Sequence, residues 1–145
     1  MEILSTELFD IIQAQAQASS RRRMHYDLRT VASLQRSGIE PSIWHDQSQR
    51  MLNVMMADTV IPIHRHNETN EVVIVLRGSG YEAIYDSTGK EMERVHIAAG
   101  SPNTGVVVPK GAWHTFIAEV DGTTIFEAKD RPYDPSTTEE YLNIQ

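Results

Sequence analysis

The stretch PIHRHNETNE, residues 62–71, decides the fold of this chain and the chemistry it can support. His64 and His66 stand two residues apart, and side chains at that spacing project from the same face of a β-strand. Residues of turn character follow, so a hairpin can return the carboxylate of Glu71 beside the two imidazoles. Further along, the turn PKGAWH, residues 109–114, places His114 at the start of another strand.

These four side chains predict a site for one divalent transition metal. Three neutral imidazole nitrogens and one carboxylate oxygen, from His64, His66, Glu71 and His114, suit Fe, Mn, Ni, Zn, Co or Cu. Such a set leaves coordination positions open for water or substrate. A bare His-x-His pair is also compatible with two solvated histidines in a polar loop. The complete pattern, which continues to Gly78 and the later turn, favours the metal.

The sequence on both sides of this stretch predicts an all-β fold. Short segments rich in Val, Ile, Met, Phe and Tyr alternate with turns that contain Gly, Pro and Asp. That alternation is typical of a sandwich or barrel and not of βαβ units. The predicted strands are 24–28, 51–57, 71–77, 81–86, 92–98, 106–108, 114–119 and 123–128. Ahead of them, apolar residues at three- and four-residue spacing predict a helix over residues 3–18, packed as a lid on the sheet or on a partner subunit.

One predicted strand carries information about assembly. The run VVIVL, residues 72–76, is apolar at every position, which indicates burial on both faces. In a small barrel one face looks inward, so the outer face needs a cover. Either the N-terminal helix or a second subunit can supply it, and the second alternative predicts a homodimer.

Composition narrows the classes of partner. The chain has 145 residues, the size of one domain, with a formal net charge of −7 and a pI near 5.3. Such an acidic chain is a poor match for phosphate backbones or for an anionic membrane surface, so neither a nucleic acid nor a membrane is an expected partner. There is no cysteine and no long apolar run. A cytoplasmic location is therefore expected.

The motifs resemble those of the cupin superfamily. The first cupin motif is matched by His64, His66, Glu71 and Gly78, and the second by Pro109, Gly111 and His114. The resemblance implies a double-stranded β-helix, or jelly-roll barrel, with the metal held inside the barrel mouth. The chain departs from the pattern at positions that are not ligands. The departures are Asp58 and Asn103 at two opening glycines, with Gly105 displaced, and Ala118 at a closing asparagine.

A closer resemblance is to the WbuC family, small bacterial cupin-fold metalloproteins associated with surface-polysaccharide gene clusters. It is carried by the arginines at 21–23, both histidine motifs, and the segments FEAK (126–129) and PYDP (132–135). The expected organisation is an N-terminal helix over 1–20, a cupin barrel over 21–130, and a C-terminal tail over 131–145 packed on the barrel.

Five further residues are candidates for the site. Arg21 and Arg23, with Lys129, can hold an anionic group of a small-molecule ligand, since guanidinium suits bidentate pairing with carboxylate or phosphate. Glu127 and His25 can carry a proton beside the metal. The opposing interpretation is a solvated basic stretch, an ordinary polar histidine and a solvated rim of the last strand.

Three functions fit these residues. The first is an enzyme, a metal-dependent isomerase or dioxygenase acting on a small oxygenated, sugar-related substrate in bacterial polysaccharide metabolism. The second is a non-catalytic protein whose bound metal anchors a small molecule. The third is a structural metal that closes the barrel.

Overall fold

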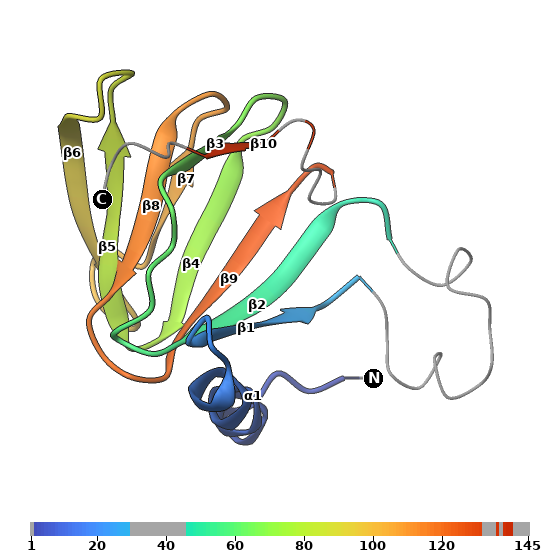
Figure 1. Cartoon of the computed structure of the whole chain (residues 1–145). Coiled ribbons are helices and arrows are strands. Elements are labelled where there is room, and N and C mark those ends of the chain that lie inside the picture. The colour runs from blue at the N-terminus through green and yellow to red at the C-terminus, as the bar shows by residue number, and fades with distance from the viewer. Residues whose placement is uncertain (1, 30–45, 132–135, 137, 141–145) are drawn as a thin grey trace.

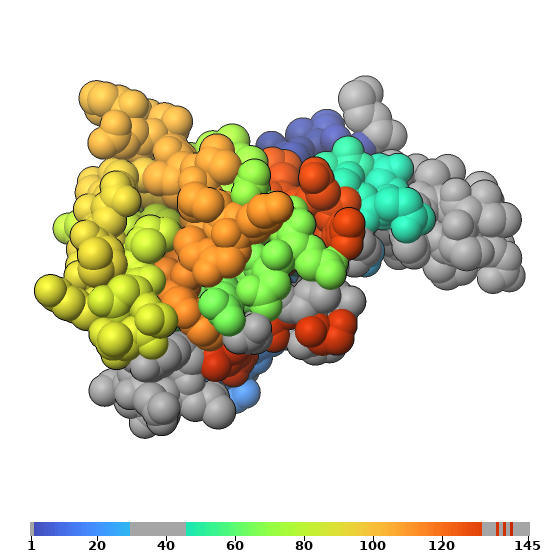
Figure 2. Space-filling model, turned by 90° about the horizontal axis from the view of Figure 1, so that it is seen from above, coloured from blue at the N-terminus to red at the C-terminus, as the bar shows by residue number. Residues whose placement is uncertain are grey.

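The computed structural model describes residues 2–29, 46–131, 136 and 138–140 as one helix followed by ten strands (Figure 1). The elements are α1 (Thr6–Ala18), β1 (Arg23–Asp27), β2 (Gln49–Met55), β3 (His64–His66), β4 (Glu71–Arg77), β5 (Ser79–Tyr85), β6 (Glu91–Ala98), β7 (Gly105–Val108), β8 (Trp113–Ala118), β9 (Thr123–Lys129) and β10 (Thr138–Glu140). They form two five-stranded sheets, with strand orders β1-β2-β9-β4-β7 and β10-β3-β8-β5-β6. In the view from above, β6 (yellow) and β2 (teal) lie at opposite sides of the molecule (Figure 2). The predicted all-β architecture is confirmed.

The hydrophobic core lies between the two sheets. On β4 the side chains alternate, and Val73 and Val75 point inward, with 1% and 3% of their surface exposed. They pack with Ile125 of β9 and Phe116 of β8 in one buried cluster. Burying an aliphatic or aromatic side chain of this size contributes roughly 1.5–3 kcal/mol. Apolar residues at inward positions of both sheets thus supply the main stabilisation around the site.

Helix α1 covers the outer face of β1 and β2. It begins at Thr6, later than the predicted residue 3, because Ser5 is the N-cap and its Oγ accepts a hydrogen bond from the Leu8 N–H at 3.2 Å. Phe9 and Ile12 are buried against β2 residues of the first sheet. In Figure 1 the helix lies beneath the β1–β2 end of this sheet. Within the described residues, no helix has the length and apolar character that a membrane span requires.

The prediction that residues 72–76 are buried on both faces is wrong for the single chain. Ile74 and Leu76, on the outer face of β4, are 37% and 40% exposed. Val107 of the adjacent strand β7 is 63% exposed. Since α1 packs on β1 and β2, it leaves this part of the outer face open. The second alternative, a partner subunit, stays a prediction.

Two short strands were missing from the predicted set. β3 is the three-residue strand assumed for His64 and His66, and β10 pairs with it, placing Thr138 opposite His66. β10 falls in the segment predicted as a tail, while residues 132–135 of that segment, the PYDP motif, lie outside the described residues. Gly78, between β4 and β5, has φ +79°, and a Cβ there would lie 2.6 Å from Thr123 Oγ1. This tight connection requires glycine, which explains its place in the motif.

Candidate metal centre

The four predicted ligands come from both sheets. His64 and His66 lie on β3, Glu71 begins β4, and His114 lies on β8, directly opposite His64 in the backbone pairing. The two histidine motifs are also joined by a backbone hydrogen bond, which the Gly111 N–H donates to the His66 carbonyl at 2.7 Å. Gly111 has φ +79°, a conformation that favours glycine. Backbone contacts therefore fix the two motifs relative to each other.

The ligand atoms converge at one point. One atom from each of the four side chains lies within 4.8 Å of the others. His66 Nε2 is 3.0 Å from Glu71 Oε2, and His114 Nε2 is 3.7 Å from Glu71 Oε1. Three of the four side chains are buried and His64 is partly exposed, so the cluster has one accessible side. These separations suit a single ion bound at about 2 Å from each donor atom.

Hydrogen bonds on the far side of the rings determine which nitrogen faces the centre. His64 Nδ1 and His114 Nδ1 each donate to the backbone carbonyl two residues earlier, at 2.8 and 2.9 Å. A carbonyl oxygen only accepts, so in both rings the proton sits on Nδ1 and the Nε2 lone pair is free. His66 Nδ1 lies 3.1 Å from Thr138 Oγ1 of β10. Such outer partners orient metal-binding imidazoles and raise their basicity.

The electrostatics of the cluster call for a cation. Burial, followed by the charge of His114, lowers the pKa of His64 to about 4, so this ring is neutral at pH 7. Burial raises the pKa of Glu71, but its interactions with His114 and His66 outweigh burial and lower that pKa below its ordinary value. His114 Nε2 is buried, and no described residue forms a hydrogen bond with it. The Nε2 lone pairs of His64 and His114 thus face the carboxylate of Glu71 and the His66 ring, and a divalent transition metal between them satisfies all four donors.

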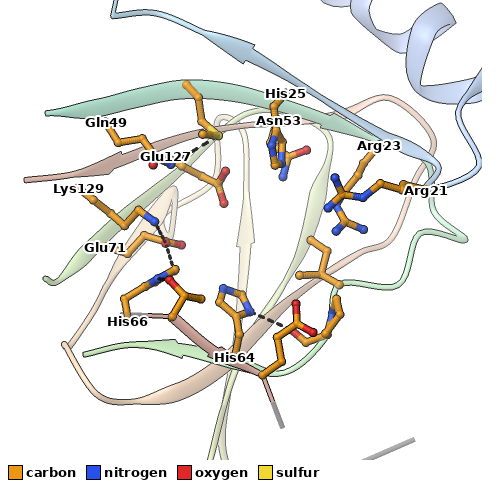
Figure 3. A pocket seen from close by; sticks show the side chains of 15 residues that line it. Arg21, Arg23, His25, Gln49, Asn53, His64, His66, Glu71, Glu127 and Lys129 are labelled. Atoms are coloured by element: carbon orange, nitrogen blue, oxygen red, sulfur yellow. Dashed lines mark hydrogen bonds and ion pairs between the residues drawn. The ribbon is translucent and has the colours of Figure 1, made fainter. Parts of the chain in front are cut away.

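A cavity of about 340 Å³ opens beside the cluster. His64, His66 and Glu71 line it, while His114 is buried and does not. The other predicted site residues all line the cavity, namely Arg21, Arg23, His25, Glu127 and Lys129. In Figure 3 these side chains surround a common space, with Arg21 and Arg23 at one end and His66 and Lys129 at the other. The structure therefore brings the predicted residues together around one cavity.

Glu127, on β9, is a carboxyl group of the cavity whose pKa is raised. Burial, followed by the negative charge of Glu71, raises its pKa to about 8. Lys129, Asn53 and Arg23 oppose that shift and do not cancel it. Glu127 is therefore largely protonated at neutral pH, while the nearby Glu71 is ionised. Two carboxyl groups with opposite protonation states in one cavity are an arrangement suited to acid–base chemistry.

The basic groups around the cavity differ in their surroundings. His25 is exposed on β1, but desolvation beside the cavity, followed by the charges of Arg23, Arg21 and Lys129, lowers its pKa to about 4, so this ring is neutral at pH 7. Lys129 is buried, with its Nζ 4.0 Å from Glu71 Oε2, and burial lowers its pKa as well. Burial, followed by the charge of Arg21, also lowers the pKa of Arg23.

Sequence reasoning missed several polar residues of this region. Gln49 and Asn53 line the cavity from β2, at the same strand parity as the inward-facing Met51, and this parity was a usable signal. Glu140 of β10 was missed because a three-residue strand carries too little pattern to predict. Glu82 of β5 is 4% exposed, and neither of its carboxyl oxygens has a hydrogen-bond partner among the described residues. Burial, followed by the charges of Glu71 and Glu127, raises the pKa of Glu82 well above its ordinary value.

Fold and site together define a class, a cupin-fold protein whose three histidines and one glutamate suit a bound metal. Solved structures show the same fold. CapF from Staphylococcus aureus, a capsular polysaccharide assembling protein, matches with a TM-score of 0.64 and 16% identity over 84% of this chain and 32% of its own. A Bacillus subtilis oxalate decarboxylase variant matches with a TM-score of 0.59 and 16% identity over 84% of this chain and 29% of its own. An oxalate oxidase in complex with the substrate analogue glycolate matches with a TM-score of 0.55 and 18% identity. This match covers 79% of this chain and 54% of the oxidase chain.

The chain belongs to the family described as Domain of unknown function (DUF6016), whose profile matches residues 4–97. That match includes His64, His66 and Glu71 and ends before His114. The chain spans less than two thirds of the length of the structural neighbours named above, and at these identities they show the fold alone. A search of curated proteins gave no match.

Proposed function

We propose that this protein is a metal-dependent enzyme that moves a proton on a small oxygenated, sugar-related substrate. His64, His66, Glu71 and His114 hold the metal, and Glu127 and His25 handle the proton. The observation that carries this proposal is the position of Glu127, which lines the same cavity as the ligands and has a pKa of about 8. A structural metal needs neither an adjoining cavity nor a protonated carboxyl group within it.

The residues of the cavity have separate roles in this proposal. When bound, a divalent transition metal supplies a Lewis acid that polarises a substrate oxygen. Glu127 is protonated near neutral pH and donates, whereas the neutral His25 ring has a free lone pair and can accept a proton. Lys129 forms an ion pair with Glu71, beside the metal cluster. Among the predicted chemistries, proton transfer during isomerisation uses these groups most directly.

The biological setting of this proposal is bacterial polysaccharide metabolism in the cytoplasm. Two observations support it, the resemblance to the WbuC family and the fold shared with CapF, a protein that assembles capsular polysaccharide. The substrate would then be a monosaccharide derivative or a related acid.

We also propose that two copies of the chain pair through the outer face of β4 and β7. Ile74, Leu76 and Val107 form an exposed apolar surface there, which α1 does not cover. Light scattering on the chain and on Val107→Lys tests this pairing. A wild-type monomer mass would remove the dimer from the proposal and leave the metal site untouched.

The second candidate function is a non-catalytic protein that captures a small molecule through its metal. The accessible side of the cluster and the cavity beside it serve such a protein equally well. What separates the two is turnover, because a binding protein has no use for a proton donor positioned at the ligand.

The test begins with elemental analysis of protein purified without oxygen, since affinity order lets zinc or copper replace a weaker-binding working metal. Small sugars and sugar acids are then screened for thermal stabilisation of the metal-loaded protein. For any compound that binds, NMR in deuterated water follows exchange of carbon-bound hydrogen. The enzyme hypothesis expects exchange in the wild type, with strongly reduced exchange and retained binding in Glu127→Gln. Binding without exchange in the wild type would favour the capture protein.

A further inference from the structure

Three consecutive arginines, Arg21 to Arg23, lead into β1, and their side chains have different contacts. Arg22 has φ +59° and turns away from the cavity. Its Nε donates to Asp58 Oδ1 at 3.0 Å, and its Nη1 donates to the Gln17 carbonyl near the end of α1 at 2.6 Å. Arg21 and Arg23, one residue to each side, line the cavity instead. Arg22 is therefore a structural connection between α1 and the loop after β2, and its two neighbours are available to a ligand.

Neither Arg21 nor Arg23 forms an ion pair with a described carboxylate, although the charges of Glu127 and Glu140 raise the pKa of Arg23. Arg23 Nη1 donates to the Val60 carbonyl at 3.0 Å, and neither guanidinium has a carboxylate within ion-pair distance in the described part of the chain. Six other arginines each form an ion pair with a carboxylate: Arg22, Arg29, Arg50, Arg77, Arg94 and Arg131. In a chain of net charge −7, two guanidiniums at one cavity without an ion pair to a described residue are a local exception.

The surroundings of Arg21 and Arg23 favour an added anion. Arg23 is partly buried, and the charge of Arg21 opposes its own, so an anion between them relieves both effects. Glu127 and Glu140 line the same cavity and raise the pKa of Arg23, but neither forms an ion pair with Arg21 or Arg23. Lys129, the other cation of the cavity, lies beside Glu71 at the opposite end (Figure 3). The cavity thus has a metal-binding end and a separate cationic end.

We propose that Arg21 and Arg23 bind the carboxylate or phosphate of the substrate while its remaining oxygens face the metal cluster. This inference rests on the proposed function, in which the bound molecule is a substrate and the cluster holds a metal. Guanidinium groups pair with both oxyanions through two parallel hydrogen bonds, so the shared chemistry is a planar or tetrahedral oxyanion on a polyoxygenated carbon skeleton. The cavity of about 340 Å³ is at the small end of ligand sites, which run from about 300 to 1,000 Å³. The substrate class is accordingly a monosaccharide acid or monosaccharide phosphate, and a sugar nucleotide is too large to be enclosed.

Isothermal titration calorimetry on the metal-loaded protein tests this assignment. The probes are glucuronate, glucose 6-phosphate and inorganic phosphate, with glucose as the uncharged comparison. We expect an anionic sugar to bind and glucose to bind at least about tenfold more weakly, because a hydrogen bond to a charged group is worth about 1.5–3 kcal/mol. Preference for glucuronate would identify a carboxylate as the natural group, and preference for glucose 6-phosphate a phosphate.

Matched variants separate the cavity from general electrostatics. Arg21→Ala and Arg23→Ala should each raise the Kd of the anionic sugar about tenfold or more, and the double variant should abolish its advantage over glucose. Arg94→Ala removes one positive charge as well, but Arg94 pairs with Glu91 on β6 outside the cavity, so its Kd should stay within about twofold. Circular dichroism confirms folding of each variant. Arg23→Lys keeps the charge without the forked geometry and should give an intermediate Kd.

Several results would overturn the inference. They are binding of no anionic probe to the metal-loaded wild type, equal binding of glucose, or an equal loss in Arg94→Ala. Elemental analysis of the same samples keeps the two proposals distinct. Full metal content without anion binding contradicts only the inference. Arginine-dependent anion binding to a protein that cannot be loaded with metal contradicts only the proposed function.

Discussion

The two ends of the cavity are built on different principles. At the metal end, β3, β4 and β8 hold four ligands, and the outward Nδ1 atom of every imidazole has a partner within 3.1 Å. At the cationic end, Arg21 and Arg23 have no carboxylate partner among the described residues. The ligands of the metal end are oriented without an ion, whereas the guanidiniums of the cationic end await the negative charge of a bound ligand. This difference is what one expects of a resident cofactor beside an exchanging substrate, and the following predictions test it.

The largest effect should come from removing a ligand at the metal end. His114→Ala takes away a buried donor opposite His64, and metal affinity should fall by more than about 100-fold, beyond the range for outer partners. Elemental analysis and competition with a chelator measure the loss. His64→Ala should behave in the same way.

A matched control exists for this experiment. His96 lies on β6, exposed, and interacts with Glu119 outside the metal cluster. His96→Ala should keep full metal content. Full occupancy in His114→Ala would contradict the ligand assignment.

The second effect concerns the pH dependence of folding in the metal-free protein. The folded-state pKa of Glu127 is about 8, above the ordinary carboxyl value of 4.5, because of burial and then the charge of Glu71. The native state therefore holds this proton more tightly. The stability that it contributes is complete below pH 4.5 and is lost as the pH rises through about 8. One such group changes the free energy of unfolding by at most about 1.4 kcal/mol per pH unit.

Urea denaturation between pH 7 and pH 8 measures this slope, because His25 and His64, whose folded-state pKa values are lowered from 6.5 to about 4, are largely neutral in both the folded and the unfolded state there. Glu127→Gln should flatten it, and Glu93→Gln, at an exposed position of β6, should leave it unchanged. Identical slopes in the wild type and Glu127→Gln would show that Glu127 does not retain its proton.

A smaller effect is expected at Thr138, the β10 residue 3.1 Å from His66 Nδ1. Thr138→Val keeps the shape and removes the hydroxyl, so the ring loses its orienting partner. Metal affinity should fall about tenfold, the lower end of the range for partners of metal-binding histidines. Thr138→Ser restores the hydroxyl and should restore the affinity. Equal affinity in all three proteins, measured by chelator competition, would mean that β10 does not contribute to the metal end.

The metal end could be predicted from the sequence and the cationic end only in part, for a physical reason. His64, His66, Glu71 and His114 follow from local rules, namely strand parity, a hairpin and a Pro–Gly turn. The strand predicted at 71–77 coincides with β4. The partners that complete the site come from distant segments, as with Thr138 and Asn53. Thr138 left no signal, because a three-residue strand is too short to show periodicity, whereas the strand parity that Asn53 shares with Met51 could have indicated it.

The local sequence pattern also could not predict which part of the sheet the helix covers. The sequence shows that α1 is amphipathic and that residues 72–76 are apolar, but it does not show which strands lie under the helix. Sheet order decides this, because β2 lies two strands away from β4, with β9 between them. The same limitation applies to Arg21, Arg22 and Arg23. Parity suggests that the outer two share a face, while the pairing of Arg22 with Asp58 depends on tertiary structure.

The smallest expected effect, at Arg22, sharpens the comparison between neighbouring arginines. Arg22→Ala removes a largely exposed ion pair with Asp58 and a hydrogen bond to the Gln17 carbonyl. Surface pairs of this kind contribute about 1 kcal/mol or less, so the free energy of unfolding should fall by roughly that amount in urea denaturation. Asp58→Asn should cause a similar or smaller loss. Neither change touches the cavity, so anion affinity should be preserved once folding is confirmed. If Arg22→Ala instead weakened anion binding as much as Arg21→Ala, the segment as a whole, and not the two flanking guanidiniums, would hold the cationic end in place.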